Sequence, residues 1–130
     1  MNSKKGFTLI EVIIVIVVLA LIGILSFIQY SNLTAMHRDE IRKSTINTIY
    51  YALENSFYQN YGYYPESISE ENLPVVAPEL WTDPDGHRLN TPESDYIYQP
   101  INCYQGRCTE YILKAHLEKE SDFFRSNNTN

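Results

Sequence analysis

An uninterrupted apolar run near the N-terminus constrains this chain more than any other stretch of its 130 residues. There is no Asp, Glu, Lys, Arg or His between Val12 and Met36, and residues 12–28 are almost wholly Val, Ile, Leu, Ala and Phe. A helix crosses the hydrocarbon core of a membrane with about 20 such residues. Lys4 and Lys5 precede the run, which predicts a cytoplasmic N-terminus. The sequence therefore predicts a single-pass membrane protein with an extracytoplasmic domain.

The residues around the start of this run do not have the order of a cleaved secretory signal. Such a signal places small residues after a short apolar core, whereas here the small residue, Gly6, comes before a long one. Glu11 is the one charge at the start of the apolar surface. An ionised carboxylate near hydrocarbon costs about 2.5–3.5 kcal/mol on insertion scales, so we expect Glu11 to have a partner. An uncleaved signal anchor is the alternative interpretation of this segment.

Residues 4–11, with the sequence KKGFTLIE, resemble the class III leader of type IV pilins and pseudopilins. In that family a membrane aspartyl peptidase cuts after the glycine and methylates the new N-terminal amine. The resemblance implies cleavage between Gly6 and Phe7 and N-methylation of Phe7. It also implies that Glu11 pairs with the Phe7 amine of a neighbouring subunit during filament assembly.

The resemblance further implies where the protein resides and what it meets. The subunit would wait in the inner membrane, be processed by prepilin peptidase and be extracted by an assembly machinery. It would then form an extracellular, homo-oligomeric helical filament, together with any minor pilins. The implied function is that of a structural pilus subunit for motility, adhesion or DNA uptake, with no cofactor. The alternatives are a pseudopilin of a type II secretion system and a membrane-anchored binding module that keeps residues 1–6.

The apolar run leads into an amphipathic segment. The charged stretch His37–Lys43 indicates where the chain emerges into water, and no proline occurs before Pro65. An apolar stripe then recurs at intervals of three and four residues, at Ile46, Ile49, Leu53 and Phe57. We expect one continuous helix from Phe7 that ends between Asn60 and Tyr64, where Gly62 and Pro65 provide the stop.

The rest of the chain predicts a small antiparallel sheet. Residues 62–94 contain five prolines among polar residues and are typical of loops, with short helical turns near Glu66–Asn72 and Val76–Trp81. We expect strands at Tyr96–Tyr98 and Thr109–Glu118 that form a hairpin through a tight turn at residues 105–106.

Together these elements predict an α+β fold, in which one long N-terminal helix packs on a small antiparallel β-sheet, the lollipop architecture of the pilin family. The expected segments are a leader at 1–6, a transmembrane or filament-core helix at 7–34, its amphipathic half at 35–61, a globular head at 62–122 and a polar, frayed tail at 123–130.

Both cysteines, Cys103 and Cys108, follow the membrane span and so lie in the extracytoplasmic part. Two cysteines in such a compartment indicate a disulfide. Zinc is the alternative, but a C-x4-C pair without a second pair is a poor zinc site. The predicted bridge clips the hairpin close to its turn.

The turn at residues 82–86 is the best candidate for a bound ion, with Asp83 and Asp85 as calcium ligands. It lacks EF-hand spacing, although its Asp-Pro-x-Gly order resembles a calcium loop of the major secretion pseudopilins. Nothing after Glu118 matches the second loop of those proteins, which favours a pilus subunit. A structural turn packed under Trp81 is the favoured alternative, so we predict no metal site. A tethered hydrolase would have only Asp83, Asp85 and His87 as candidate catalytic residues.

The remaining composition indicates a structural protein. The chain carries 10 Lys and Arg against 16 Asp and Glu, and loss of the two leader lysines leaves 8 against 16. An acidic body of this kind does not favour nucleic-acid binding. The sequence contains no catalytic motif, and its three histidines are scattered. The eleven tyrosines are best explained by packing between the helix stripe and the sheet.

Overall fold

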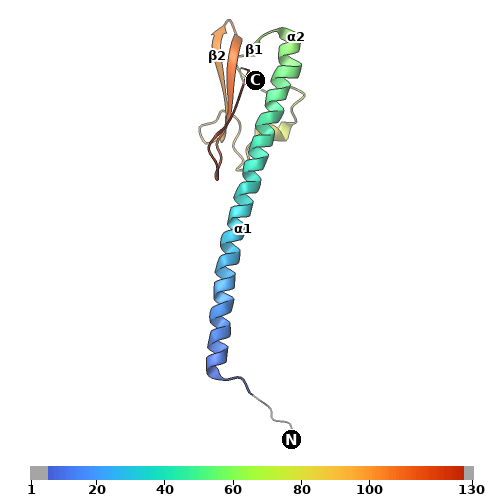
Figure 1. Cartoon of the computed structure of the whole chain (residues 1–130). Coiled ribbons are helices and arrows are strands. Elements are labelled where there is room, and N and C mark those ends of the chain that lie inside the picture. The colour runs from blue at the N-terminus through green and yellow to red at the C-terminus, as the bar shows by residue number, and fades with distance from the viewer. Residues whose placement is uncertain (1–5, 128–130) are drawn as a thin grey trace. The chain divides into compact units, whose positions relative to one another are not determined.

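The structure of the chain, a computed structural model, describes residues 6–127 (Figure 1). The predicted leader residues Lys4 and Lys5 and the last part of the predicted tail, residues 128–130, lie outside the described residues. The chain divides into two compact units at the Ala35–Met36 bond, and each unit is described by itself.

A helical segment extends without interruption from Leu9 to Tyr61. It consists of α1 (Leu9–Ala52), a π-helical turn η1 (Leu53–Tyr58) and α2 (Gln59–Tyr61). Gly62 ends it with a left-handed φ of 74°, and its N–H donates to the Tyr58 carbonyl at 2.7 Å. A glycine adopts this conformation without a steric cost, which makes it a common helix stop. The predicted continuous helix and its end are confirmed, although the helix begins two residues after Phe7.

In the first unit, α1 exposes its apolar surface on every side. Residues 6–31 are all exposed, and the side chains from Leu9 to Ile28 have no cover within the described part of the chain. By length and composition, this helix is able to cross a membrane. An apolar surface of this extent has to be covered by lipid or by another protein.

The second unit contains a four-stranded antiparallel sheet. Its strands are β1 (Tyr64–Pro65), β2 (Tyr96–Tyr104), β3 (Arg107–Ala115) and β4 (Phe123–Ser126). Strand β3 is central, because it pairs with β2 along one edge and with β1 and β4 along the other. The predicted hairpin is confirmed, although its first strand is longer than predicted and its second begins at Arg107 and ends at Ala115, three residues before the predicted end.

The core of the second unit lies between the helix stripe and the sheet. Ile46, Ile49, Leu53 and Phe57 are buried, as predicted. The sheet contributes alternate side chains to the same core, namely Tyr96, Tyr98, Tyr111, Leu113 and Ala115. The helix and the antiparallel sheet therefore form the predicted α+β fold, with tyrosine rings filling much of the interface.

Three local predictions need correction. Residues 123–126 of the predicted frayed tail form β4, because the backbone of Phe123–Ser126 pairs with Ile112–Ala115. Residues 66–72 contain bends and turns in place of a helical turn, while a 3-10 turn, η2, does form at Pro78–Trp81. Strand β2 continues through Pro100, which an edge strand tolerates because one side of its backbone needs no ladder partner.

The π-helical turn η1 was not predicted and has a local reason. Its residue Glu54 contacts two strands of the sheet. The Glu54 carboxylate accepts hydrogen bonds from the Tyr111 hydroxyl of β3 at 2.7 Å and the Tyr64 hydroxyl of β1 at 3.1 Å. Burial, and then the Glu54 carboxylate, raise the pKa of both tyrosines. Leu53 and Phe57 stay buried on the same turn. The extra residue in the π-helical turn therefore keeps the apolar stripe of the helix in the core. It also lets the Glu54 carboxylate reach the two buried tyrosine hydroxyls.

The hairpin turn has the geometry that its residues favour. Gln105 and Gly106 have φ values of 51° and 76°, and positive values at both central positions belong to a type I′ turn. Cys103 lies opposite Cys108 in the β2–β3 register, and the two form a disulfide. The predicted bridge is confirmed. It closes a small ring beside an exposed turn.

Removing this bridge should have a modest effect. A Cys103→Ser/Cys108→Ala variant is expected to lower the free energy of unfolding by about 2 kcal/mol, because a ring of this size restricts the unfolded chain only slightly. Denaturant unfolding of the full chain in detergent, followed by the fluorescence of its single tryptophan, Trp81, measures this change. Failure of the variant to fold would contradict the modest role of the bridge.

Candidate functional site

The N-terminal residues singled out by the sequence lie at the start of α1. Phe7 is 79% exposed and, with Gly6, precedes the helix. Thr8 caps the helix, since its carbonyl accepts the Glu11 N–H at 3.1 Å and its hydroxyl lies 3.4 Å from the same nitrogen. The Gly6–Phe7 peptide bond therefore lies outside the helix, between two exposed residues.

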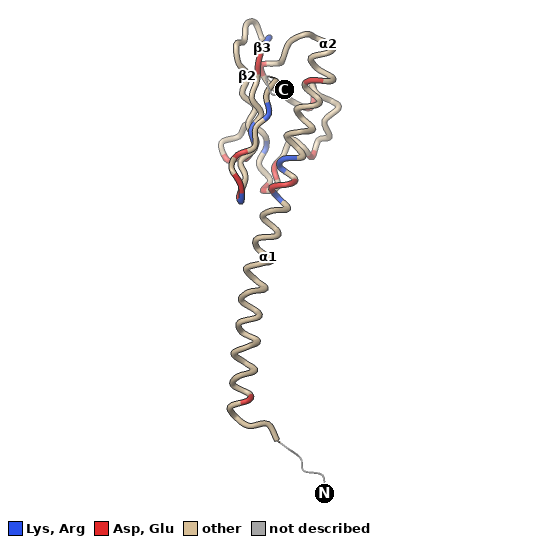
Figure 2. Tube along the Cα trace, viewed as in Figure 1, with Lys and Arg blue, Asp and Glu red and all other residues tan. Residues whose placement is uncertain are grey.

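Glu11 occupies the first turn of α1, three residues after the cap. A carboxylate there is favoured by the partial positive charge of the helix N-terminus. Within residues 6–127, Glu11 is exposed and forms no ion pair. The order Thr-x-x-Glu is that of a capping box, a signal that the sequence contained and that sequence reasoning missed. Figure 2 shows this single acidic position near the beginning of the helix.

The two calcium candidates lie in the second unit, and protein groups already engage both. Asp83 is buried, and its carboxylate accepts three backbone N–H groups, from His87 at 2.8 Å, Asp95 at 2.9 Å and Asp85 at 3.0 Å. Burial by itself would raise the pKa of Asp83, but these three donors outweigh it and lower the pKa. The carboxylate thus organises the loop as an internal turn.

The other candidate, Asp85, forms an ion pair with Arg42, whose Nη2 lies 2.6 Å from the carboxylate. Gly86 closes the turn through its N–H to the Asp83 carbonyl at 3.0 Å, and Trp81 beside it is buried. Across residues 6–127, no group of three or more His, Cys, Asp or Glu side chains is arranged to hold a metal ion. The geometry therefore favours the structural turn over a calcium site.

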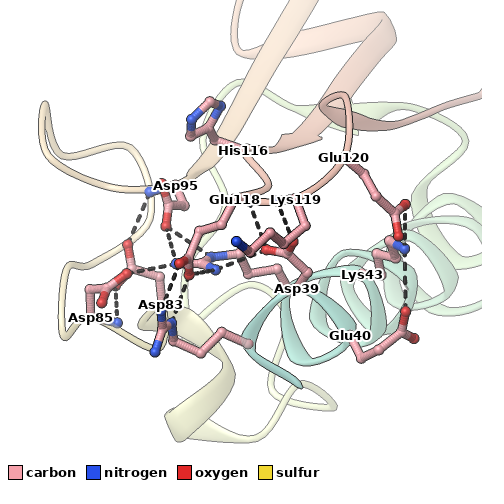
Figure 3. Close-up of polar contacts among 12 residues, drawn as sticks. Asp39, Glu40, Lys43, Asp83, Asp85, Asp95, His116, Glu118, Lys119 and Glu120 are labelled. Carbon is pink, nitrogen blue, oxygen red and sulfur yellow. Dashed lines mark hydrogen bonds and ion pairs between the residues drawn. The ribbon is translucent and has the colours of Figure 1, made fainter. Parts of the chain in front are cut away.

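Arg42 is the centre of this region and is only 1% exposed. Figure 3 labels the acidic residues that meet here, Asp39, Asp85, Asp95 and Glu118. The charged stretch His37–Lys43 was expected to face water, and for Arg42 and Asp39 this expectation is wrong. The Arg42 guanidinium contacts four carboxylates, at distances from 2.6 to 3.1 Å: Asp39, Asp85, Asp95 and Glu118. We call these five residues the Arg42 cluster. A guanidinium is suited to it, because its five donors spread in a plane toward several acceptors.

Asp39 joins the helix to the segment that follows β3. Its two oxygens accept the backbone N–H groups of Glu118 and Lys119, each at 2.9 Å, and it also pairs with Arg42. Burial would raise the pKa of Asp39, but the two N–H donors and the Arg42 charge lower it. The helix is thereby attached to a part of the chain almost 80 residues away in sequence.

Glu118 connects the cluster to the surface. It accepts two hydrogen bonds from Arg38, both at 2.6 Å, and a third from Arg42 at 2.7 Å. The Arg38 bonds first, and then the Arg42 bond, lower the pKa of Glu118 to about 2. The carboxylate is thus held ionised by two arginines from successive turns of the helix.

His87 and His116 each lie beside a carboxylate that is not part of the Arg42 cluster. His87 Nδ1 lies 3.6 Å from Asp83, but that carboxylate is already occupied by three backbone donors. His116 pairs instead with Asp122 at 2.7 Å. The contacts of the Arg42 cluster and of Asp83 hold the helix, the loop around Asp83 and the segment after β3 together, which is a structural role.

A helix that packs on a small four-stranded antiparallel sheet is a pilin-like α+β arrangement. Residues 1–27 match the family model of the prokaryotic N-terminal methylation motif. This motif is the class III prepilin leader of type IV pilins and pseudopilins. No curated protein and no solved structure matches the chain. The match covers the leader and the first part of α1, and it does not extend to the second unit.

Removing the central guanidinium should destabilise the second unit strongly. We expect Arg42→Met to lower the free energy of unfolding by about 3–5 kcal/mol, because it leaves the buried Asp39 carboxylate and three partly exposed carboxylates without their common partner. Denaturant unfolding of the full chain, followed by Trp81 fluorescence, measures the loss.

The matched control for Arg42→Met is Arg88→Ala, which removes an exposed ion pair with Glu70. Such a pair contributes about 0–1 kcal/mol. Equal losses in the two variants would contradict the central role of Arg42.

The lowered carboxylate pKa values also predict sensitivity to acid. The pKa values of Asp39, Asp83 and Glu118 are lower in the folded chain than in the unfolded chain, so their contribution is complete above the unfolded values. It is lost as the pH falls from the ordinary value of 4.5 for Glu118 toward about 2. Near-ultraviolet circular dichroism during heating should show the melting temperature falling across this window.

Glu118→Gln is expected to flatten this acid dependence, since the amide cannot titrate. Glu93→Gln, at an exposed loop position, is the control and should leave the profile of melting temperature against pH unchanged. A wild-type melting temperature that stays constant down to about pH 2 would contradict the assignment.

Proposed function

We propose that this chain is the structural subunit of a type IV pilus filament. The observation that carries the proposal is the match of residues 1–27 to the N-terminal methylation motif. It is supported by the exposed Gly6–Phe7 bond. It is also supported by the apolar surface of α1, since residues 6–31 are all exposed. A structural role also agrees with the second unit, where the carboxylates near the histidines are engaged in holding the fold.

The precursor inserts into the inner membrane with its N-terminus in the cytoplasm and its second unit outside. Prepilin peptidase cleaves it between Gly6 and Phe7 and methylates the new amine. An assembly machinery then extracts the subunit from the membrane. The apolar helices of many copies, with any minor pilins, pack against one another and no longer contact lipid. The contact is head-to-tail with a rotation that does not close, so that the product is an extracellular helical filament.

Glu11 sets the axial register in this proposal. A carboxylate within an apolar filament core is tolerated only when a positive group compensates it. The Phe7 amine of a neighbouring copy is that group, and α1 presents Glu11 on its exposed first turn. Within residues 6–127, Glu11 has no competing ion-pair partner.

A pseudopilin of a type II secretion system is the second candidate, because the same leader serves both classes. The Asp83 loop favours the pilus subunit. Its two candidate calcium ligands are engaged by backbone N–H groups and by Arg42, which supplies the positive charge there.

The proposal is tested in the cells that make the protein, by shearing surface filaments and measuring the mass and N-terminal residue of the chain. Wild-type protein should begin at N-methylated Phe7 and be present in the sheared fraction. We expect Glu11→Ala to be inserted and cleaved but to fall at least tenfold in that fraction, because a subunit without the carboxylate loses its register contact.

Glu93→Ala is the matched control, since it removes an exposed carboxylate from a loop of the second unit, and its filament yield should equal that of wild type. Wild-type chains that still begin at Met1 and stay in the membrane would overturn the proposal in favour of an anchored binding module. Unchanged filament yield in Glu11→Ala would overturn the register role alone.

A further inference from the structure

The backbone becomes helical shortly after the Gly6–Phe7 bond, and one side chain fixes that point. The described residues before Leu9 form no helix (Figure 1). The Glu11 and Val12 N–H groups both donate to the Thr8 carbonyl, at 3.1 and 3.3 Å. The Thr8 hydroxyl lies 3.4 Å from the same Glu11 nitrogen. A residue that accepts the first helical bond on its carbonyl, and meets the N–H three residues later with its side chain, is an N-cap.

This helix start leaves the carbonyl of the Gly6–Phe7 bond free. Within residues 6–127, no backbone or side-chain group donates a hydrogen bond to the Gly6 carbonyl. A methyl group on the Gly6 Cα would meet no atom of the described chain within 4 Å, apart from its own neighbours in sequence. Gly6, Phe7, Thr8 and Glu11 line an open hollow of about 420 Å³. Both residues of the bond are therefore reachable from outside the chain.

Loss of the Thr8 cap would move the helix start toward this bond. Leu and Ile are far weaker caps than Thr, whereas Gly is about as good a cap as Thr. Gly6 is therefore the nearest replacement. Helical pairing joins each N–H to the carbonyl four residues earlier, so a helix capped by Gly6 would engage the Gly6 carbonyl with the Ile10 N–H. The carbonyl that is free in the folded chain would then lie inside the first turn.

We propose that Thr8 is a positioning residue for leader cleavage, because it keeps the Gly6–Phe7 bond out of α1. The inference rests on the proposed function, in which prepilin peptidase hydrolyses this bond, and the match of residues 1–27 points to that peptidase. In the hydrolysis, water adds to the Gly6 carbonyl carbon, the bond to the Phe7 nitrogen breaks and that nitrogen takes a proton. The peptidase binds the fraction of precursor in which this carbonyl is free, and the Thr8 cap sets that fraction.

Two substitutions at position 8 separate the cap from the shape of the side chain. Thr8→Val keeps the branched shape of threonine but removes the cap, whereas Thr8→Asn changes the shape and keeps a strong cap. Full-length precursors in detergent micelles, cleaved by purified prepilin peptidase, give KM and kcat. A threonine cap changes the helix equilibrium about fivefold, so KM of Thr8→Val should rise about fivefold with kcat unchanged. Thr8→Asn should have the wild-type KM.

Thr34→Val is the matched control. It removes a threonine hydroxyl from the same helix, where that hydroxyl donates to the Tyr30 carbonyl at 2.9 Å and caps nothing. Its KM and kcat should equal those of wild type. A general effect of losing a hydroxyl from α1 would change both variants alike and would overturn the proposal.

Carbon-13 chemical shifts of the uncleaved precursors provide a second measurement. Phe7 should be non-helical in wild type and in Thr8→Asn, and helical in Thr8→Val. A wild-type KM in Thr8→Val, or a Phe7 that stays non-helical in it, would overturn the positioning role. Thr8→Asn impaired as strongly as Thr8→Val would also overturn it, because the peptidase would then recognise the threonine side chain itself. These outcomes leave the proposed function in place, whereas a wild-type precursor that the peptidase does not cleave would overturn both.

Discussion

The fold of the second unit depends on one buried cation, the Arg42 guanidinium. It meets four carboxylates that the chain supplies from positions 3 to 76 residues away. Removing a charge from water costs several kcal/mol, which is recovered only when its hydrogen bonds are satisfied. Arg42 offsets this desolvation cost through its hydrogen bonds to the four carboxylates. These bonds hold the helix, the loop around Asp83 and the segment after β3 in one arrangement. The proline-rich loop, which has little regular structure of its own, is thereby given a defined position.

The long helix serves two different environments, and its residues divide accordingly. From Leu9 to Ile28 the apolar side chains are exposed all around, as suits lipid or the helices of other copies. After Met36 the buried apolar side chains of the helix form one stripe, which packs against the sheet. The π-helical turn η1 shows how closely this second part is adjusted to its sheet, since it brings Glu54 to two buried tyrosine hydroxyls. One continuous helix thus supports both an assembly surface and a folded unit.

Several features could be predicted because short spacings encode them. The stripe Ile46–Phe57, the helix stop at Gly62 and the hairpin turn at Gln105-Gly106 depend on neighbours within a few residues, and all three are present. Strand β4 and the burial of Arg42 were missed. A charged residue in a polar helical stretch is normally solvated, and no local pattern distinguishes the exception. Strand β4 has only four residues, two of them polar, and it forms because β3 offers a free edge.

The amino-acid sequence alone was enough to predict the apolar helix, the leader motif around Gly6 and Glu11, the disulfide and the α+β class. These features follow from hydrophobicity, charge and turn preferences that act over a few residues. The Arg42 cluster and the engagement of Asp83 by three backbone donors needed the folded chain. Each depends on groups that are far apart in sequence and meet only once the sheet has packed on the helix. Hydrogen bonds form only at donor–acceptor distances of about 3 Å, and Coulomb energy weakens with distance, so such sites exist only where the fold brings their members together.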